Sequence, residues 1–343
     1  MQKGYNIKVY ELDGTFERVL SPSVVMSGVS FSETVDGWQG ELRLKLKLPF
    51  NTTDIGYNNI VRVYQTEENN APRLIYAGIV GNIQRVNENS SEYIEVRVLG
   101  LASVLSMFYF YESGYAFSKT GTGDAIIEDI IDYFSTKYPG LVTYTGSSLE
   151  AVWSVNVAFD YTKCLDAIKN VTGLFSSSWW TIGPDGVFEF HPKVWGSSEV
   201  LHRLKVGVDV DKITVEENSV RIVNIYMLKY ASSTYIASDA TSQTVNWLRE
   251  LREDKSTEIN DGGTATIAGD QYIAQNKDAK RKITIEVNAN YDIESIRAGH
   301  FVTVQNIEYS ISSLQVLKIE YNMDKIKLEL EDFSSFGKEV FRS

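Results

Sequence analysis

The feature that most constrains this chain is a strict alternation of apolar and polar residues at both ends of the sequence. Toward the C-terminal end, the alternating block runs from Lys282 to Leu330, with breaks at 298–299 and 322–324. A period of two is typical of β-strands with one buried face and one face that is wet or contacts a partner. Four such strands in about 50 residues predict a compact antiparallel sheet or a small barrel.

The first hundred residues carry the same kind of pattern. In Glu41–Leu48 every second residue is a leucine and the others are charged, until Pro49 ends the strand. Asp13-Gly14 is typical of a hairpin turn. The other predicted strands in this region are Ser27–Glu33, Asn59–Gln65, Leu74–Val86 and Tyr93–Leu99, with a loop over Val35–Gly40. Strands separated by such regular turns predict a β-barrel or sandwich.

The middle of the chain changes to helical spacing. An apolar stripe from Ile126 to Tyr138 predicts a helix that starts near Thr122-Gly123-Asp124. A second helix is predicted over Thr162–Val171, with Cys164 packed on its inner face. A phosphate site at the first helix start is disfavoured because the loop lacks a P-loop lysine and carries acidic residues, so we interpret Thr122 as a helix cap.

The predicted fold class is therefore mainly β with an α+β insert. Two tube-forming β-barrel modules, residues 1–105 and 206–333, flank an α+β domain at 106–205, and 334–343 form a C-terminal tail. Within the second module, Gly269–Lys280 is expected to form a short polar helix.

Composition argues against several kinds of site. The formal charge of −12 disfavours a protein that neutralises nucleic-acid phosphates, although it is also ordinary for a soluble protein. A single cysteine allows no intrachain disulfide and no cysteine metal cluster, and the three histidines show no ligand spacing. We therefore predict no cofactor and no metal.

No catalytic motif stands out in the sequence. The 209–217 segment resembles a calcium loop only loosely, because its glycine and terminal glutamate are out of place. A pair of carboxylates that acts as in a glycosidase remains an open alternative, because any acidic protein has many carboxylates. The first residues lack a secretory apolar segment, and the longest apolar run, Val98–Tyr111, is too short to span a bilayer. We expect no stable membrane insertion.

Tryptophans are the candidate contact residues. Indole rings bury large areas and retain a polar N–H group, so they suit protein interfaces. The residues predicted for a subunit or partner interface are Trp38, Trp179, Trp180 and Trp195. A sugar-binding platform formed by the last three is the alternative interpretation.

Several stretches in a fixed order resemble a known family. At the N-terminal end these are Gly40–Leu46, Asn59–Tyr64, Leu74–Val80 and Val96–Leu101; at the other end they are Ile293–Val302, Ile319–Tyr321 and Leu328–Asp332. This order resembles the baseplate hub and tail-tip proteins of bacteriophages and related contractile injection systems, including the T-even phage hub and the late-control D protein.

The resemblance implies a structural protein of the virion tail, assembled in the cytoplasm of the host bacterium, and not an enzyme. Such hubs carry two pseudo-symmetric β-barrel modules per chain, and three chains form a ring that matches the hexameric tail tube. The implied partners are two further copies of the chain, the tail tube or distal tail protein, a spike or fibre-bearing tip protein and the tape-measure protein. Neither sequence-specific nucleic-acid binding nor a cofactor is implied, and the lumen is expected to be acidic so that DNA slides through. A tail-tip adaptor, a carbohydrate-binding module or, less favoured, a glycan hydrolase are the alternatives.

Overall fold

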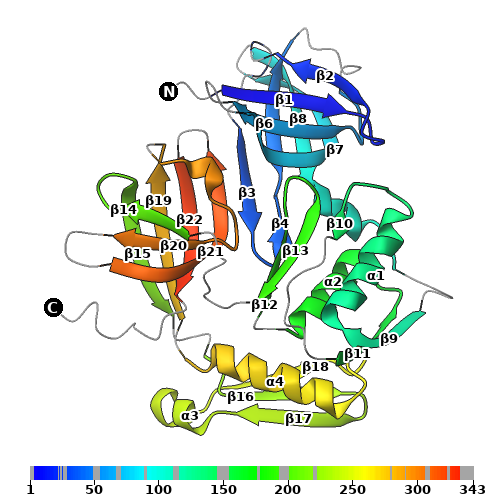
Figure 1. Ribbon diagram of the computed structural model, residues 1–343, viewed down its shortest axis with the longest axis vertical. Helices are drawn as coiled ribbons and strands as arrows, with labels where there is room; N and C mark the ends of the chain where they lie inside the picture. The colour runs from blue at the N-terminus through cyan, green and yellow to red at the C-terminus, as the bar shows by residue number, and fades with distance from the viewer. Residues whose placement is uncertain are drawn as a thin grey trace.

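The computed structural model describes residues 4–21, 23, 25, 29–48, 55–66, 71–88, 91–110, 116–144, 154–175, 178–192, 201–218, 222–278, 280–289, 291–305, 310–322 and 325–332. Its strands form two curled sheets, a central unit with helices, and a three-stranded sheet covered by a helix (Figure 1). The chain is mainly β, as the alternation predicts. None of the described helices is long and apolar enough to cross a membrane.

The first curled sheet has the strand order β2-β1-β6-β7-β8-β5, with all neighbours antiparallel. Its strands are β1 (Gly4–Tyr10), β2 (Phe16–Leu20), β5 (Leu42–Lys47), β6 (Ile60–Thr66), β7 (Arg73–Glu88) and β8 (Ser91–Gly100). In β5 the three leucines are buried and the three basic residues are exposed. The alternation in the sequence therefore sets which face of this strand meets the core.

The second curled sheet has the order β14-β20-β21-β22-β19-β15. Its strands are β14 (Leu201–Lys205), β15 (Val210–Asn218), β19 (Lys280–Asn288), β20 (Phe301–Gln305), β21 (Ser310–Asn322) and β22 (Lys325–Asp332), with the short 3-10 helix η3 (Ile293–Ser295) before β20. All neighbours are antiparallel except β14 and β20, which are parallel.

The two curled sheets share a four-strand arrangement. The order is β5-β8-β7-β6 in the first and β19-β22-β21-β20 in the second, so the earliest strand pairs with the last in both. The long third strands also carry one extra residue at matching places. Pairing between β7 and β8 skips Gly81, and pairing between β21 and β22 skips Leu317. Such bulges bend a strand and strengthen its twist, so both sheets curl at this point.

The central unit shares its core with the first curled sheet. Its four-stranded sheet has the order β10-β13-β12-β4, and β9 pairs with β11 separately. The elements are β4 (Gly37–Trp38), η2 (Leu101–Ser106), β9 (Ala116–Thr122), α1 (Gly123–Ser135), β10 (Thr143–Tyr144), β11 (Ser154–Asp160), α2 (Cys164–Gly173), β12 (Ser178–Ile182) and β13 (Val187–Pro192). The Thr122 hydroxyl accepts a hydrogen bond from the Ala125 N–H group, which confirms the predicted helix cap.

A further small unit follows β15. Its sheet has the order β17-β16-β18, and α4 packs on β16 and β17 (Figure 1). The elements are β16 (Ile225–Tyr230), β17 (Ser233–Ser238), α3 (Ala240–Asn246), β18 (Glu250–Asp254) and α4 (Gly262–Asn276). The helix expected over Gly269–Lys280 starts seven residues earlier. The Asp261 carboxylate caps this helix by accepting a hydrogen bond from the Thr264 N–H group at 2.9 Å. The helix therefore begins here although its first two residues are glycines.

Strand membership does not follow the predicted module limits at every point. The strand β3 (Ser30–Thr34), which lies in the predicted first module, pairs with β21 of the second sheet. The strand β14, predicted as part of the insert, also belongs to the second sheet. Alternation predicts that a segment is a strand, but not which strand it pairs with.

Candidate assembly site

The segment β3–β4 joins three sheets. It leaves the first curled sheet, and β3 pairs antiparallel with β21 from Ser30 opposite Asn322 to Thr34 opposite Lys318. After two intervening residues, β4 pairs in parallel with β12 of the central sheet. Figure 1 shows β3 crossing the space between the two curled sheets. The sequence predicted a strand here and a loop after it, so the second pairing was missed.

Phe31 carries the apolar part of this junction. Its ring centroid lies 5.0 Å from that of Tyr76 on β7 and 4.9 Å from that of Tyr321 on β21. All three side chains are buried. One ring of β3 therefore packs against both curled sheets, and the buried residues of the two sheets form one continuous cluster.

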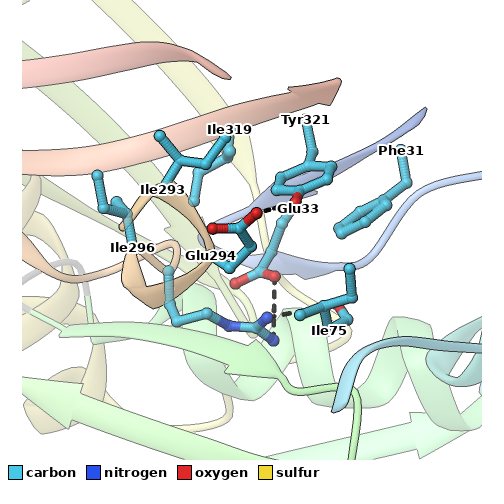
Figure 2. Close-up of a pocket in the computed structure, with 9 residues that line it drawn as sticks. Phe31, Glu33, Ile75, Ile293, Glu294, Ile296, Ile319 and Tyr321 are labelled. Carbon is cyan, nitrogen blue, oxygen red and sulfur yellow. Dashed lines mark hydrogen bonds and ion pairs between the residues drawn. The ribbon is translucent and has the colours of Figure 1, made fainter. Parts of the chain in front are cut away.

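Glu33 carries the polar part. It is 3% exposed, and its carboxylate lies 3.1 Å from Arg297 Nη2 and 3.3 Å from Gln39 Nε2. The Ala298 N–H group donates to the other oxygen at 3.0 Å. Gln39 Nε2 also donates to the Ile75 carbonyl at 2.7 Å, so the network continues into β7. In Figure 2 a dashed line at Glu33 marks this ion pair. A buried carboxylate needs such partners to stay charged.

A second buried carboxylate, Glu294, lies beside this pair (Figure 2). It accepts a hydrogen bond from the Tyr321 hydroxyl at 2.9 Å and one from the Tyr5 hydroxyl at 3.4 Å. Burial raises the pKa of Tyr321, and hydrogen bonding to Tyr5 and the nearby carboxylate add to this rise. The tyrosine therefore keeps its proton and remains a donor to Glu294.

The pocket between these groups is small. It has room for about 10 Å³, which is about one water molecule. Pockets for small-molecule ligands are usually larger, about 300–1,000 Å³. Its polar side chains already bond to one another, so the arrangement is suited to fixing two sheets in one orientation rather than to holding a substrate.

Two of the three histidines, distant in sequence, meet in the second sheet. His202 Nε2 lies 3.0 Å from His300 Nδ1, which also accepts from the Arg297 N–H group at 3.1 Å. His202 Nε2 must therefore be the donor, and His202 Nδ1 accepts from the Tyr291 hydroxyl at 3.1 Å. Burial lowers the pKa of His300 to about 3, and the nearby His202 adds to this effect. Burial also lowers the pKa of His202.

This histidine pair is not built as a metal site. The bonded nitrogen of His300 already accepts from a backbone N–H group, so it has no lone pair to offer. Across the described ranges, no group of three or more histidine, cysteine or acidic residues is arranged to hold a metal ion. Asp209 and Asp211, the loosely calcium-like residues, instead accept hydrogen bonds from the Lys205 N–H group and the Asn288 amide.

Two of the predicted contact tryptophans lie inside the chain. Trp179 and Trp180 are 3% and 1% exposed, so neither can form part of a sugar platform or a surface contact in this conformation. Trp179 stacks on His191 with a centroid distance of 4.6 Å. Its ring also covers Gly299, where an added Cβ atom would lie 2.1 Å from the indole. Trp179 thus joins the central sheet to the second curled sheet.

The other predicted tryptophans differ from this pair. Trp38 is partly buried, and the Lys169 ammonium group lies over its ring at 5.4 Å. Trp195 lies outside the described residues. The interface role of these two stays a prediction.

Sequence reasoning missed Trp247, which is 82% exposed. The signal was present, because Val245, Trp247 and Leu248 are apolar residues in a polar stretch. Cys164, by contrast, is buried as predicted, and burial raises the pKa of its thiol to about 12.

This architecture was compared with those of known proteins. No protein-family model matches the sequence, and no curated protein matches it. Among solved structures, the tail protein from Neisseria meningitidis MC58 is 11% identical with a TM-score of 0.68, and the alignment covers 96% of this chain and 97% of that one. The 43 kDa tail protein of prophage MuSo2 from Shewanella oneidensis is 11% identical with a TM-score of 0.67, covering 96% and 98%.

The chain has the fold of these tail proteins. The prophage tail protein gp18 from Listeria monocytogenes EGD-e is also similar, with 10% identity, a TM-score of 0.59 and coverage of 96% and 95%. The tail-protein fold thus extends over nearly the whole chain, including the small unit around α3 and α4.

Proposed function

We propose that this chain is a structural protein of a phage tail, the hub of a baseplate or tail tip, and that three copies form a ring that caps the tail tube. The observation that carries the proposal is the shared strand order and bulge position of the two curled sheets. Two similar walls in one chain give six walls in a trimer. A three-fold ring can in this way match a six-fold tube.

The junction supports the same proposal. A chain that supplies two neighbouring walls must hold them at a fixed angle, or the ring would not close. Phe31 and the Glu33–Arg297 ion pair connect the two sheets through buried contacts. Rotation then generates contacts between unlike surfaces of successive copies, and these close on themselves.

The proposed partners follow from this ring. One rim contacts the tail tube or distal tail protein, and the other docks the spike or fibre-bearing tip. Tape-measure protein and DNA pass through the channel, and the net charge of −12 per chain favours passage of DNA without binding. The chain would reside in the virion tail and catalyse no reaction.

Light scattering during size-exclusion chromatography tests the ring. We expect a mass three times the 38.7 kDa of one chain. Electron microscopy of that species should show a three-fold ring with six lobes. A chain that stays monomeric at every concentration, both alone and in tail particles, would contradict the proposal. Cleavage of peptidoglycan by the purified chain would instead favour the glycan hydrolase alternative.

A further inference from the structure

The corner between α3 and β18 presents an apolar surface to solvent. We call Val245, Trp247 and Leu248 the Trp247 corner; their exposed fractions are 68%, 82% and 61%. Single exposed apolar residues are ordinary. These three stand within four consecutive positions and include an indole, a side chain that is enriched at interfaces.

The backbone of this corner is strained and firmly held. Trp247 has φ +62° and ψ 174°, a backbone conformation that residues other than glycine rarely adopt. The fully buried Asn224 holds it in place. Its amide donates to the Trp247 carbonyl at 2.6 Å and accepts from the Arg249 N–H group at 2.8 Å. Strain of this kind persists where the surroundings enforce it, often at binding sites. The fold therefore fixes the backbone that carries this exposed indole.

Two sets of hydrogen bonds limit the distance between the corner and the end of β22. The Lys277 carbonyl, at the end of α4, accepts hydrogen bonds from Ser242 and Asn246 of α3. Lys282, five residues later, pairs with Glu331 of β22. Five residues span at most about 18 Å, so β22 ends within reach of α3.

The sequence that follows β22 has the chemistry to cover the corner. Residues 333–343 include Phe333, Phe336, Val340 and Phe341. Eleven extended residues reach about 36 Å, which is enough to span the distance from the end of β22 to the corner. Phenyl rings suit an exposed indole because aromatic pairs stack edge to face or with an offset.

We infer that residues 333–343 of the same chain bind the Trp247 corner, with their phenylalanine rings against the indole and the two aliphatic side chains. The tether keeps this segment at a high local concentration, so a weak apolar contact is sufficient. The inference concerns a contact within one chain and does not depend on ring formation.

An introduced thiol tests the contact in the full chain. Native Cys164 is buried with a raised pKa, so a Leu248→Cys variant carries one reactive thiol among the described residues. Its rate of reaction with a water-soluble disulfide reagent is compared with that of the same variant ending at Asp332. We expect the full chain to react at least about fivefold more slowly, since a short tether supplies a millimolar effective concentration. Equal rates would overturn the inference.

Matched variants identify the cause of the protection. Replacing Phe333, Phe336 and Phe341 together by serine should raise the rate to that of the shortened chain, whereas Lys338→Ser with Glu339→Ser should not. A Val19→Cys variant, exposed on β2, should react equally with and without residues 333–343.

A crosslink separates this contact from one between copies. A Leu248→Cys, Phe336→Cys chain should form its disulfide within one chain, at a rate independent of concentration and in monomer and trimer alike. Crosslinked dimers alone would assign the corner to a second copy and overturn the inference. Protection that appears only when a chito-oligosaccharide is added would overturn it in favour of a sugar site.

Discussion

At the scale of single residues, Gly299 shows how an absent side chain lets two units of the fold meet. It has φ +89°, and the ring of Trp179 from the central sheet lies directly over its Cα atom. An added Cβ atom would lie 2.1 Å from this buried indole, so the ring or the backbone must shift.

We therefore predict that Gly299→Ala lowers the unfolding free energy by about 3 kcal/mol or more, since strain and a steric clash add. Urea denaturation measures this change. Gly207→Ala is the control, because Gly207 has φ +81° with no atom within 4 Å of an added Cβ. It should cost about 1 kcal/mol from the backbone alone. An equal decrease in unfolding free energy in both variants would show that the Trp179 ring moves aside without cost.

The histidine pair makes stability depend on pH. His300 has a pKa of about 3 in the folded chain and an ordinary value of 6.5. Between these values the unfolded chain binds a proton that the folded chain excludes. Stability is therefore full above about pH 6.5 and falls as the pH drops toward 3, by at most about 1.4 kcal/mol per pH unit.

We predict that His300→Gln makes the unfolding free energy less dependent on pH between about pH 6.5 and 4, relative to the original chain. Urea denaturation at several pH values measures both slopes. The carboxylates are common to the two proteins, so the difference isolates the histidine. His202→Gln should flatten the profile in the same direction, because burial lowers the pKa of His202 as well. An equal pH dependence of the unfolding free energy in the original chain and in His300→Gln would contradict the lowered pKa of His300.

At the scale of elements, the sequence predicted which segments are strands better than it predicted their partners. Strict alternation in Glu41–Leu48 predicted the buried face of β5. No local pattern says that β3 pairs with β21, because the choice of partner depends on sheet geometry. The site was missed for the same reason: Glu33 and Arg297 are 264 residues apart and meet only through that pairing. His202 and His300 are 98 residues apart, so no short motif in the sequence predicted their contact.

The Glu33–Arg297 ion pair fixes β3 at the junction. We predict that Arg297→Met destabilises the chain by about 3–5 kcal/mol, because it leaves a buried carboxylate without its cation. Adding Glu33→Gln should recover part of that loss, as a double-mutant cycle would show. The exposed pair of Arg85 and Glu92, 2.5 Å apart, is the control, and Arg85→Met should cost less than about 1 kcal/mol. Additive losses at the junction would mean that the pair is not coupled.

At the scale of the whole molecule, the strand exchange makes the two curled sheets depend on each other. A chain that lacks residues 1–105 would leave Lys318–Asn322 of β21 without their β3 partner and remove Phe31 from the shared core. Open strand edges favour aggregation. We predict that this shortened chain is insoluble when expressed alone and becomes soluble when residues 1–105 are co-expressed. Solubility and co-purification of the two pieces measure this outcome, and a soluble, folded 106–343 fragment would contradict it.

The strand β7 contributes to two cores at once. Tyr76 and Val80 belong to the core of the curled sheets, whereas Ala77 and Ile79 pack into the core of the central unit. An inserted or deleted residue between positions 74 and 80 would reverse both sets of side chains together. Insertions and deletions in homologous chains should therefore be confined to places such as the hairpin that joins β7 to β8. A homologous chain that aligns with residues 74–80 without a gap should share both cores.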